Sequence, residues 1–141
     1  MNILVLNGPN LNLLGSREPD IYGSGTYGDL VRYIESCAAG VSAAVEIRQS
    51  NHEGDLVDWI HEARGKFDAI VLNAAAYTHT SLAILDALKA VKVRTVEVHL
   101  SEPKAREEFR HFSYVALAAE KTFSGLGFES YAHAIRYLVG A

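Results

Sequence analysis

Short apolar runs alternate along this chain with longer segments of helical period, and this alternation limits the fold more than any other feature. Five runs predict strands, at residues 2–6, 43–49, 69–73, 95–100 and 121–125. Between and after them, apolar residues recur every three or four positions, which predicts four helices. The apolar faces of these helices are Tyr27, Leu30, Val31, Ile34 and Ala38; Leu56, Trp59, Ile60 and Ala63; Leu82, Leu85, Leu88 and Val91; and Phe128, Tyr131, Ala132, Ile135, Leu138 and Val139. The order predicts an α/β fold: a doubly wound five-stranded parallel sheet with helices on both faces.

The strands at 2–6 and 69–73 are apolar on both faces, as central strands of such a sheet should be. Ligands of these sheets bind beyond the carboxyl ends of the strands, at the switch point. In the strand order 2-1-3-4-5, the first, third and fourth strands are neighbours. The unusual polar residues follow these three strands, in "NGPNLNLLGSREPDIYG", "NAAAYTHTS" and "HLSEPKAREEFRH". We therefore expect one site at that edge.

Composition excludes several classes of function. The 141 residues carry a net charge of −4, so no general basic field favours nucleic acid or an anionic membrane. One cysteine excludes an internal disulfide and a cysteine-based zinc cluster. No apolar run approaches the roughly 20 residues of a membrane span, and the first strand is too short for a signal peptide. We expect one cytoplasmic domain over residues 1–141, without nucleic acid or membrane partners.

The loop after the first strand runs about twenty residues, from Asn7 to Thr26, and loops of this length are usually functional or disordered. We expect residues 15–26 to form a mobile lid. This loop contains Arg17 and Tyr22. A guanidinium can lower a phenol pKa by about one to three units from roughly 10, which would make Tyr22 a general base near neutral pH.

Other candidates lie at the strand ends. His99 is at the tip of the fourth strand, and Glu97 lies on the same face, where it can orient the imidazole. His79 precedes the third helix, and Asn73 ends a buried strand, where its amide needs a partner. A metal site from His79, His99 and Glu97 is an alternative, although it lacks the helical HExxH pattern.

The remaining polar candidates have simpler interpretations. Arg106 and Arg110 are one helical turn apart, which is typical of a solvated helix face, but Arg110 turned inward would supply a cation for an anionic substrate. Arg106 would then contact the residues that bind the substrate, and not the substrate itself. We expect Cys37 and Trp59 in the core; the histidines expected on the surface are His52, His61 and His133.

Taken together, four blocks and a short motif resemble the type II 3-dehydroquinate dehydratases. They are "NGPNLNLLGSREPDIYG", "NAAAYTHTS", "EVHLS" and "AREEFRHFSY", followed by "GLG" before the last helix, and the resemblance covers the whole chain in order. It implies a flavodoxin-like fold and a reaction without a cofactor. That reaction removes water from 3-dehydroquinate to give 3-dehydroshikimate, by anti elimination through an enolate, in the shikimate pathway or in quinate breakdown.

The resemblance also implies four catalytic roles. Tyr22 would remove the proton alpha to the ketone, and Arg17 would lower the pKa of Tyr22. Asn10 would hold the water that stabilises the enolate oxygen. His99 would protonate the departing hydroxyl.

Substrate binding and assembly are implied in the same way. Asn73 and His79 would bind the ring hydroxyls, and Arg110 would bind the hydroxyls on the far side of the ring. Leu100 and Ser101 would hold the carboxylate, partly through backbone N–H groups. The family assembles as dodecamers of four trimers. Asp86 matches the family residue that reaches into the site of a neighbouring subunit.

Three departures from the family pattern stand out. Glu102 and Lys104 replace the asparagine and histidine that often follow the strand-tip histidine, and Phe112 stands where a second histidine is frequent. "NAAAY" replaces the commoner Pro-Gly or Pro-Ala after the asparagine. We expect these changes to alter supporting contacts and not the reaction.

Two other classes of function remain open. A flavodoxin-like nucleotide- or flavin-binding module is suggested by "GSGTYG" at 23–28, but this pattern lies some sixteen residues after Leu6 instead of directly after the strand. A lyase that dehydrates its substrate through a lysine imine would need a lysine at a strand tip. Lys104 is the nearest candidate.

Overall fold

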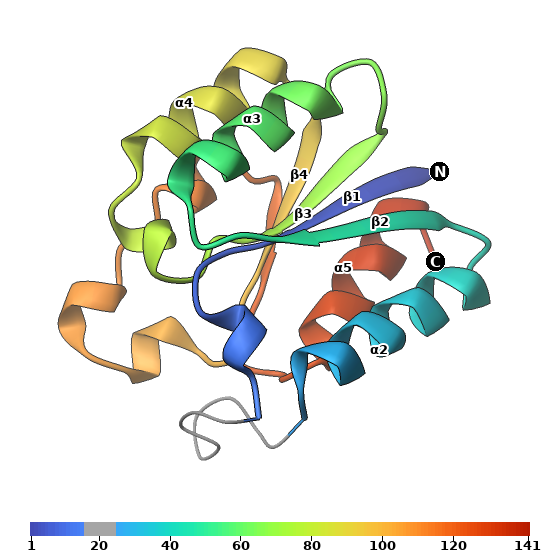
Figure 1. The fold of residues 1–141 in the computed structure, drawn as a ribbon, viewed down its shortest axis with the longest axis horizontal. Coiled ribbons are helices and arrows are strands. Elements are labelled where there is room, and N and C mark those ends of the chain that lie inside the picture. The colour runs from blue at the N-terminus through green and yellow to red at the C-terminus, as the bar shows by residue number, and fades with distance from the viewer. Residues whose placement is uncertain (16–24) are drawn as a thin grey trace.

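The computed structural model describes residues 1–15 and 25–141, and its centre is a five-stranded parallel sheet (Figure 1). The strand order is β2-β1-β3-β4-β5, which confirms the predicted flavodoxin-like arrangement. The strands are β1 (Asn2–Asn7), β2 (Ala44–Gln49), β3 (Ala69–Asn73), β4 (Arg94–Val98) and β5 (Lys121–Phe123).

Helices cover both faces of the sheet (Figure 1). One core cluster joins the sheet to α2 (Tyr27–Gly40) and α5 (Glu129–Val139), and the other joins it to α3 (Glu53–Ala63) and α4 (Leu82–Val91). Alternate residues of β1 enter opposite clusters, as the pleat of a strand requires. This two-sided burial explains why the central strands are apolar throughout. No helix in the described ranges is both long and apolar enough to cross a membrane.

Side-chain caps fix two helix starts near the predicted site. The Thr26 hydroxyl accepts from the backbone N–H of Asp29, and the Asp29 carboxylate accepts from the N–H of Thr26, which forms a capping box at α2. Ser81 caps α4 by accepting from the N–H of Ile84. Both helices therefore begin at the carboxyl edge of the sheet, where the ligand is expected.

The two central strands approach closely at this edge because Gly8 follows β1. A Cβ at Gly8 would lie 2.5 Å from the backbone oxygen of Ala74. The Gly8 N–H donates to the carbonyl oxygen of Asn73 at 2.8 Å. Glycine is the residue that permits this approach, and it sets the spacing between the loops that follow β1 and β3.

Some local predictions were wrong. The predicted strand at 95–100 ends at Val98, so His99 lies just beyond it. Arg106 and Arg110 do not share an α-helical face, because the chain forms two 3-10 turns, η3 (Pro103–Ala105) and η4 (Glu108–Arg110). Leu82, expected on the buried face of its helix, is exposed, whereas Cys37 and Trp59 are partly buried and pack against the two core clusters.

Candidate active site

The loops after β1, β3 and β4 together form one pocket at the carboxyl edge of the sheet. η1 (Leu11–Leu13) follows β1, and η2 (Ala75–His79) follows β3. Eight of the residues predicted for the site line this pocket: Asn10, Asn73, His79, His99, Leu100, Ser101, Arg106 and Arg110. The structure therefore brings together residues that the strand order predicts to be neighbours.

Four other predicted residues are not among the described residues that line this pocket. Arg17 and Tyr22 lie outside the described residues, as does most of the expected lid. Asp86 is exposed on α4 and does not contribute to the pocket of its own chain. Glu97 lines a second pocket, which shares His79, His99 and Arg110 with the first.

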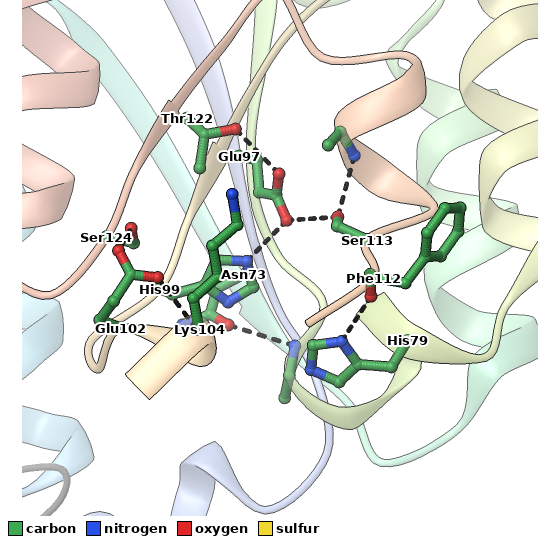
Figure 2. A network of polar contacts seen from close by, with 12 residues as sticks. Asn73, His79, Glu97, His99, Glu102, Lys104, Phe112, Ser113, Thr122 and Ser124 are labelled. Carbon is green, nitrogen blue, oxygen red and sulfur yellow. Dashed lines mark hydrogen bonds and ion pairs between the residues drawn. The ribbon is translucent and has the colours of Figure 1, made fainter. Parts of the chain in front are cut away.

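Glu97 holds His99 from the interior of the protein (Figure 2). The His99 Nε2 lies 2.6 Å from Glu97 Oε2, and the side chains are 9% and 2% exposed respectively. Ser113 donates to the same carboxylate oxygen at 2.6 Å, and Thr122 donates to Oε1 at 2.9 Å. Burial raises the pKa of Glu97, but these hydrogen bonds and the charge of His99 outweigh burial, so its pKa is lowered. Because the ionised carboxylate of Glu97 accepts a hydrogen bond from Nε2 of His99, Nδ1 is the ring nitrogen that remains to interact with a ligand in the pocket.

A backbone carbonyl fixes the orientation and tautomer of His79. Its Nδ1 lies 2.8 Å from the Phe112 oxygen, which can only accept a hydrogen bond (Figure 2). Burial lowers the pKa of His79, and the Phe112 hydrogen bond offsets this only in part. The neutral imidazole therefore carries its proton on Nδ1 and offers Nε2 as an acceptor. Because Phe112 acts through its backbone, the side-chain departure at this position leaves the contact intact.

The pocket is suited to an anion despite the negative net charge of the chain. Arg106 and Arg110 line it with side chains that are 15% and 26% exposed, and no Asp or Glu does so among the residues that the structure describes. Arg110 is held by Glu107, which accepts from its Nε at 3.2 Å. Two mostly buried guanidinium groups favour a carboxylate or several hydroxyl oxygens.

Backbone donors add to this anion-binding character. The carbonyl oxygens of Leu100 and Ser101 accept from the N–H groups of Gly127 and Gly125, at 3.0 and 3.1 Å. The Leu100 and Ser101 N–H groups themselves donate no hydrogen bond within residues 1–15 and 25–141. Gly125 and Gly127, before α5, thus bind the carbonyl groups of Leu100 and Ser101. The N–H groups of Leu100 and Ser101 remain available as donors to a ligand.

Several supporting residues were missed in the sequence. The site was expected only from the segments after the first, third and fourth strands, yet the side chain of Asn51, which follows β2, accepts from the backbone N–H of Asn10 at 2.9 Å. Asn10 has a φ of 70°, a left-handed conformation that asparagine tolerates better than most residues. Ser113 and Thr122 gave no signal because their partner, Glu97, is distant in sequence. The Asn–Gly–Pro–Asn turn was the signal that could have indicated a strained Asn10.

Two other departures from the family pattern, Glu102 and Lys104, form contacts beside the pocket. Glu102 accepts from the Ser124 hydroxyl at 2.8 Å and from the Lys104 N–H at 3.2 Å. Lys104 is exposed and lines the second pocket, not the one containing the two arginines. The described residues contain no group of three His, Cys, Asp or Glu side chains suited to a metal ion.

Comparison with known proteins gives one family. The model of dehydroquinase class II matches residues 1–139. A 3-dehydroquinate dehydratase of Phenylobacterium zucineum is 56% identical over 138 residues, which cover 98% of this chain and 95% of that protein. One from Bacillus licheniformis is 51% identical, with the same coverage of both chains.

Solved structures agree with this result. The type II dehydroquinase from Butyrivibrio crossotus has a TM-score of 0.96 and 45% identity, covering 100% of this chain and 98% of that one. The corresponding protein from Propionibacterium acnes has a TM-score of 0.95 and 42% identity, covering 99% and 97%. Fold and sequence therefore agree, and the chain belongs to the class II dehydroquinase family, the type II 3-dehydroquinate dehydratases.

Proposed function

We propose that the chain removes water from 3-dehydroquinate to give 3-dehydroshikimate, by anti elimination through an enolate. The type II 3-dehydroquinate dehydratase activity and its place in the shikimate pathway follow from membership of the family. The steps and the residue roles are our proposal. One C–H bond and one C–O bond break, a C=C bond forms, and the departing hydroxyl leaves as water, so no oxidant or reductant is needed.

Proton transfer is assigned to two side chains. Tyr22 takes the proton alpha to the ketone, and Arg17 stabilises the phenolate form that makes this possible. His99 gives a proton from Nδ1 to the departing hydroxyl. Asn10 orders a water against the enolate oxygen, where a hydrogen-bond donor stabilises the developing charge. The cycle closes when Tyr22 releases its proton to solvent and His99 takes up one in its place, so both residues regain their starting protonation states and no cofactor takes part.

Substrate binding is assigned to the remaining pocket residues. The N–H groups of Leu100 and Ser101 hold the substrate carboxylate. Asn73 and His79 bind the ring hydroxyls, and Arg110 binds the hydroxyls on the far side. Arg106 lies beside Arg110 and strengthens the positive field around the anion.

The single observation that carries this proposal is the combination of acid and anion site in one pocket. His99, oriented by the buried Glu97, lies on the wall of a pocket that also contains Arg106 and Arg110. A β-hydroxy ketone with a carboxylate needs that combination. Among the described residues, β1 is followed by the 3-10 turn η1 and not by a glycine-rich phosphate loop that opens a helix, which disfavours the flavin- or nucleotide-binding alternative.

The test is a continuous assay with purified protein and 3-dehydroquinate. The ultraviolet absorbance of the conjugated enone should rise with wild type and with the control Tyr137→Phe, which changes an exposed residue of α5. Tyr22→Phe should lower the rate by at least about a hundredfold, the usual contribution of a general base. An absorbance that stays flat with wild type would contradict the proposed reaction. A rate undiminished in Tyr22→Phe would place the base elsewhere, with His99 the next candidate.

We also propose that the whole chain is one catalytic domain with a lid over residues 15–26, and that it assembles as a dodecamer of four trimers. In this assembly Asp86 of one subunit would reach the site of a neighbour. The exposed position of Asp86 on α4 leaves it available for such a contact.

A further inference from the structure

A chain of buried hydrogen bonds runs from the pocket wall into the protein interior. Asn73 Nδ2 donates to the Tyr131 hydroxyl at 2.9 Å, and this hydroxyl donates to Asn7 Oδ1 at 2.6 Å. Asn73 is 3% exposed, and the other two residues are fully buried. Asn7 and Asn73 are register partners at the ends of β1 and β3, and Tyr131 reaches them from α5. Only Asn73 of these three lines the pocket.

The direction of the chain determines how Asn73 faces the pocket. The Tyr131 hydroxyl has a single hydrogen, which it gives to Asn7, so its oxygen must accept from the amide nitrogen of Asn73. The opposite edge of the amide is fixed as well, because Asn73 Oδ1 accepts from the Ala75 N–H at 3.2 Å. One N–H of Nδ2 is then left for a ligand, and Asn73 acts toward the pocket as a donor.

Core packing alone does not require these polar groups. A phenylalanine at position 131 would fill nearly the same space, and buried amides and hydroxyls destabilise a core unless each is paired. Burial also raises the pKa of Tyr131, so its hydroxyl stays protonated and keeps the direction of the chain fixed. The chain ends at a residue assigned to substrate binding.

We propose that Tyr131 is a positioning residue, whose hydroxyl holds the Asn73 amide with an N–H directed at a substrate hydroxyl. The neutral His79 offers the complementary acceptor, Nε2, on the same pocket. A hydroxyl between them accepts from Asn73 and donates to His79. The pair thereby distinguishes a hydroxyl from a keto oxygen, which cannot donate. This inference rests on the proposed function.

A double-mutant cycle tests it, with the variants Tyr131→Phe, Asn73→Ala and the two combined. Tyr131→Phe should raise KM for 3-dehydroquinate about tenfold and change kcat less, since a hydrogen bond to a bound ligand is weakened in both ground and transition states. In the Asn73→Ala background the same substitution should change KM by less than about twofold, because the residue it positions is gone. Equal factors in both backgrounds would overturn the inference, as would an unchanged KM in Tyr131→Phe.

Two further variants separate this role from a general loss of structure. Tyr137→Phe removes a hydroxyl of the same helix that donates to Glu120 at 2.9 Å, on an exposed surface, and should leave KM unchanged. If Tyr131→Phe does not fold, Asn7→Leu removes the acceptor that directs the hydroxyl, and it should raise KM only when Asn73 is present. Wild type without turnover would overturn the proposed function together with this inference, whereas turnover with independent effects overturns the inference alone.

Discussion

At Glu97, one carboxylate accepts three hydrogen bonds, from His99, Ser113 and Thr122. Glu97→Gln keeps the shape but replaces one acceptor oxygen by an NH₂ group, which must face a donor. It also removes the negative charge beside His99. We expect kcat to fall by about tenfold or more, with a smaller change in KM, because the acid acts mainly in the transition state. Steady-state kinetics measures this effect, and the control is Glu35→Gln, which changes an exposed carboxylate of α2. Equal kcat values in the two variants would contradict the role of Glu97.

The same residue predicts a pH dependence of folding. The pKa of Glu97 is lowered below its usual value of 4.5, so its ionised form stabilises the folded protein. This contribution is complete above about pH 4.5 and is lost as the pH falls through the lower folded-state pKa, at about 1.4 kcal/mol for each unit of lowering. The difference in unfolding free energy between wild type and Glu97→Gln should therefore shrink below pH 4.5. Urea unfolding across this range measures it, and a difference independent of pH would refute the assignment.

His79 predicts a pH dependence of substrate binding. Burial lowers its pKa from the ordinary 6.5, so Nε2 is an acceptor at neutral pH and becomes a donor only in more acid solution. As the pH falls through that lowered pKa, a substrate hydroxyl loses its acceptor and KM should rise. His79→Gln cannot titrate, and its KM should show no such rise over the same range. Parallel KM profiles for the two proteins would exclude this role.

At the scale of elements, the approach of β1 to β3 predicts a large effect of one methyl group. In Gly8→Ala the new Cβ would meet the Ala74 backbone at 2.5 Å, so the ends of the two strands must separate. We expect a loss of about 1–3 kcal/mol in unfolding free energy and a lower kcat/KM, because Asn73 is displaced. The control is Gly54→Ala in α3, where nothing lies within 4 Å and alanine should stabilise the helix by about 0.5–1 kcal/mol. Urea unfolding that ranks the two variants in the opposite order would disprove the account.

Sequence was sufficient for the elements that depend on local pattern and insufficient for those that depend on distant contacts. Apolar periodicity identified all five strands of the sheet and the four described α-helices, and the strand order placed the pocket. The helical face at 106–110 was wrong because Pro103 begins a 3-10 turn and a second turn packs beside η2. Tyr131 was correctly expected in the core, but its partners are 58 and 124 residues away. A local sequence pattern cannot predict hydrogen bonds between residues so far apart in the chain.

At the scale of the whole molecule, several large apolar side chains of the described residues are exposed, as the proposed assembly would require. Leu82 is 56% exposed at the first turn of α4, and Asp86 lies one helical turn further on the exposed surface. Phe109 and Leu117 are 71% and 58% exposed. Large exposed apolar residues are typical of subunit interfaces, and closed oligomers bury the same patch on each copy.

The proposed dodecamer predicts the effect of a charge at Leu82. Wild type should sediment as twelve copies of the 15.4 kDa chain. Leu82→Glu should dissociate this assembly, because a carboxylate buried between subunits without a partner is strongly unfavourable. If Asp86 completes a neighbouring site, kcat/KM should fall in parallel with the sedimenting mass and recover at higher protein concentration.

The control Ala90→Glu adds the same charge at an exposed position near the end of α4 and should leave the sedimenting mass and kcat/KM unchanged. A Leu82→Glu protein that keeps the wild-type mass would place the interface elsewhere, and a fully active monomer would show that each chain holds a complete site.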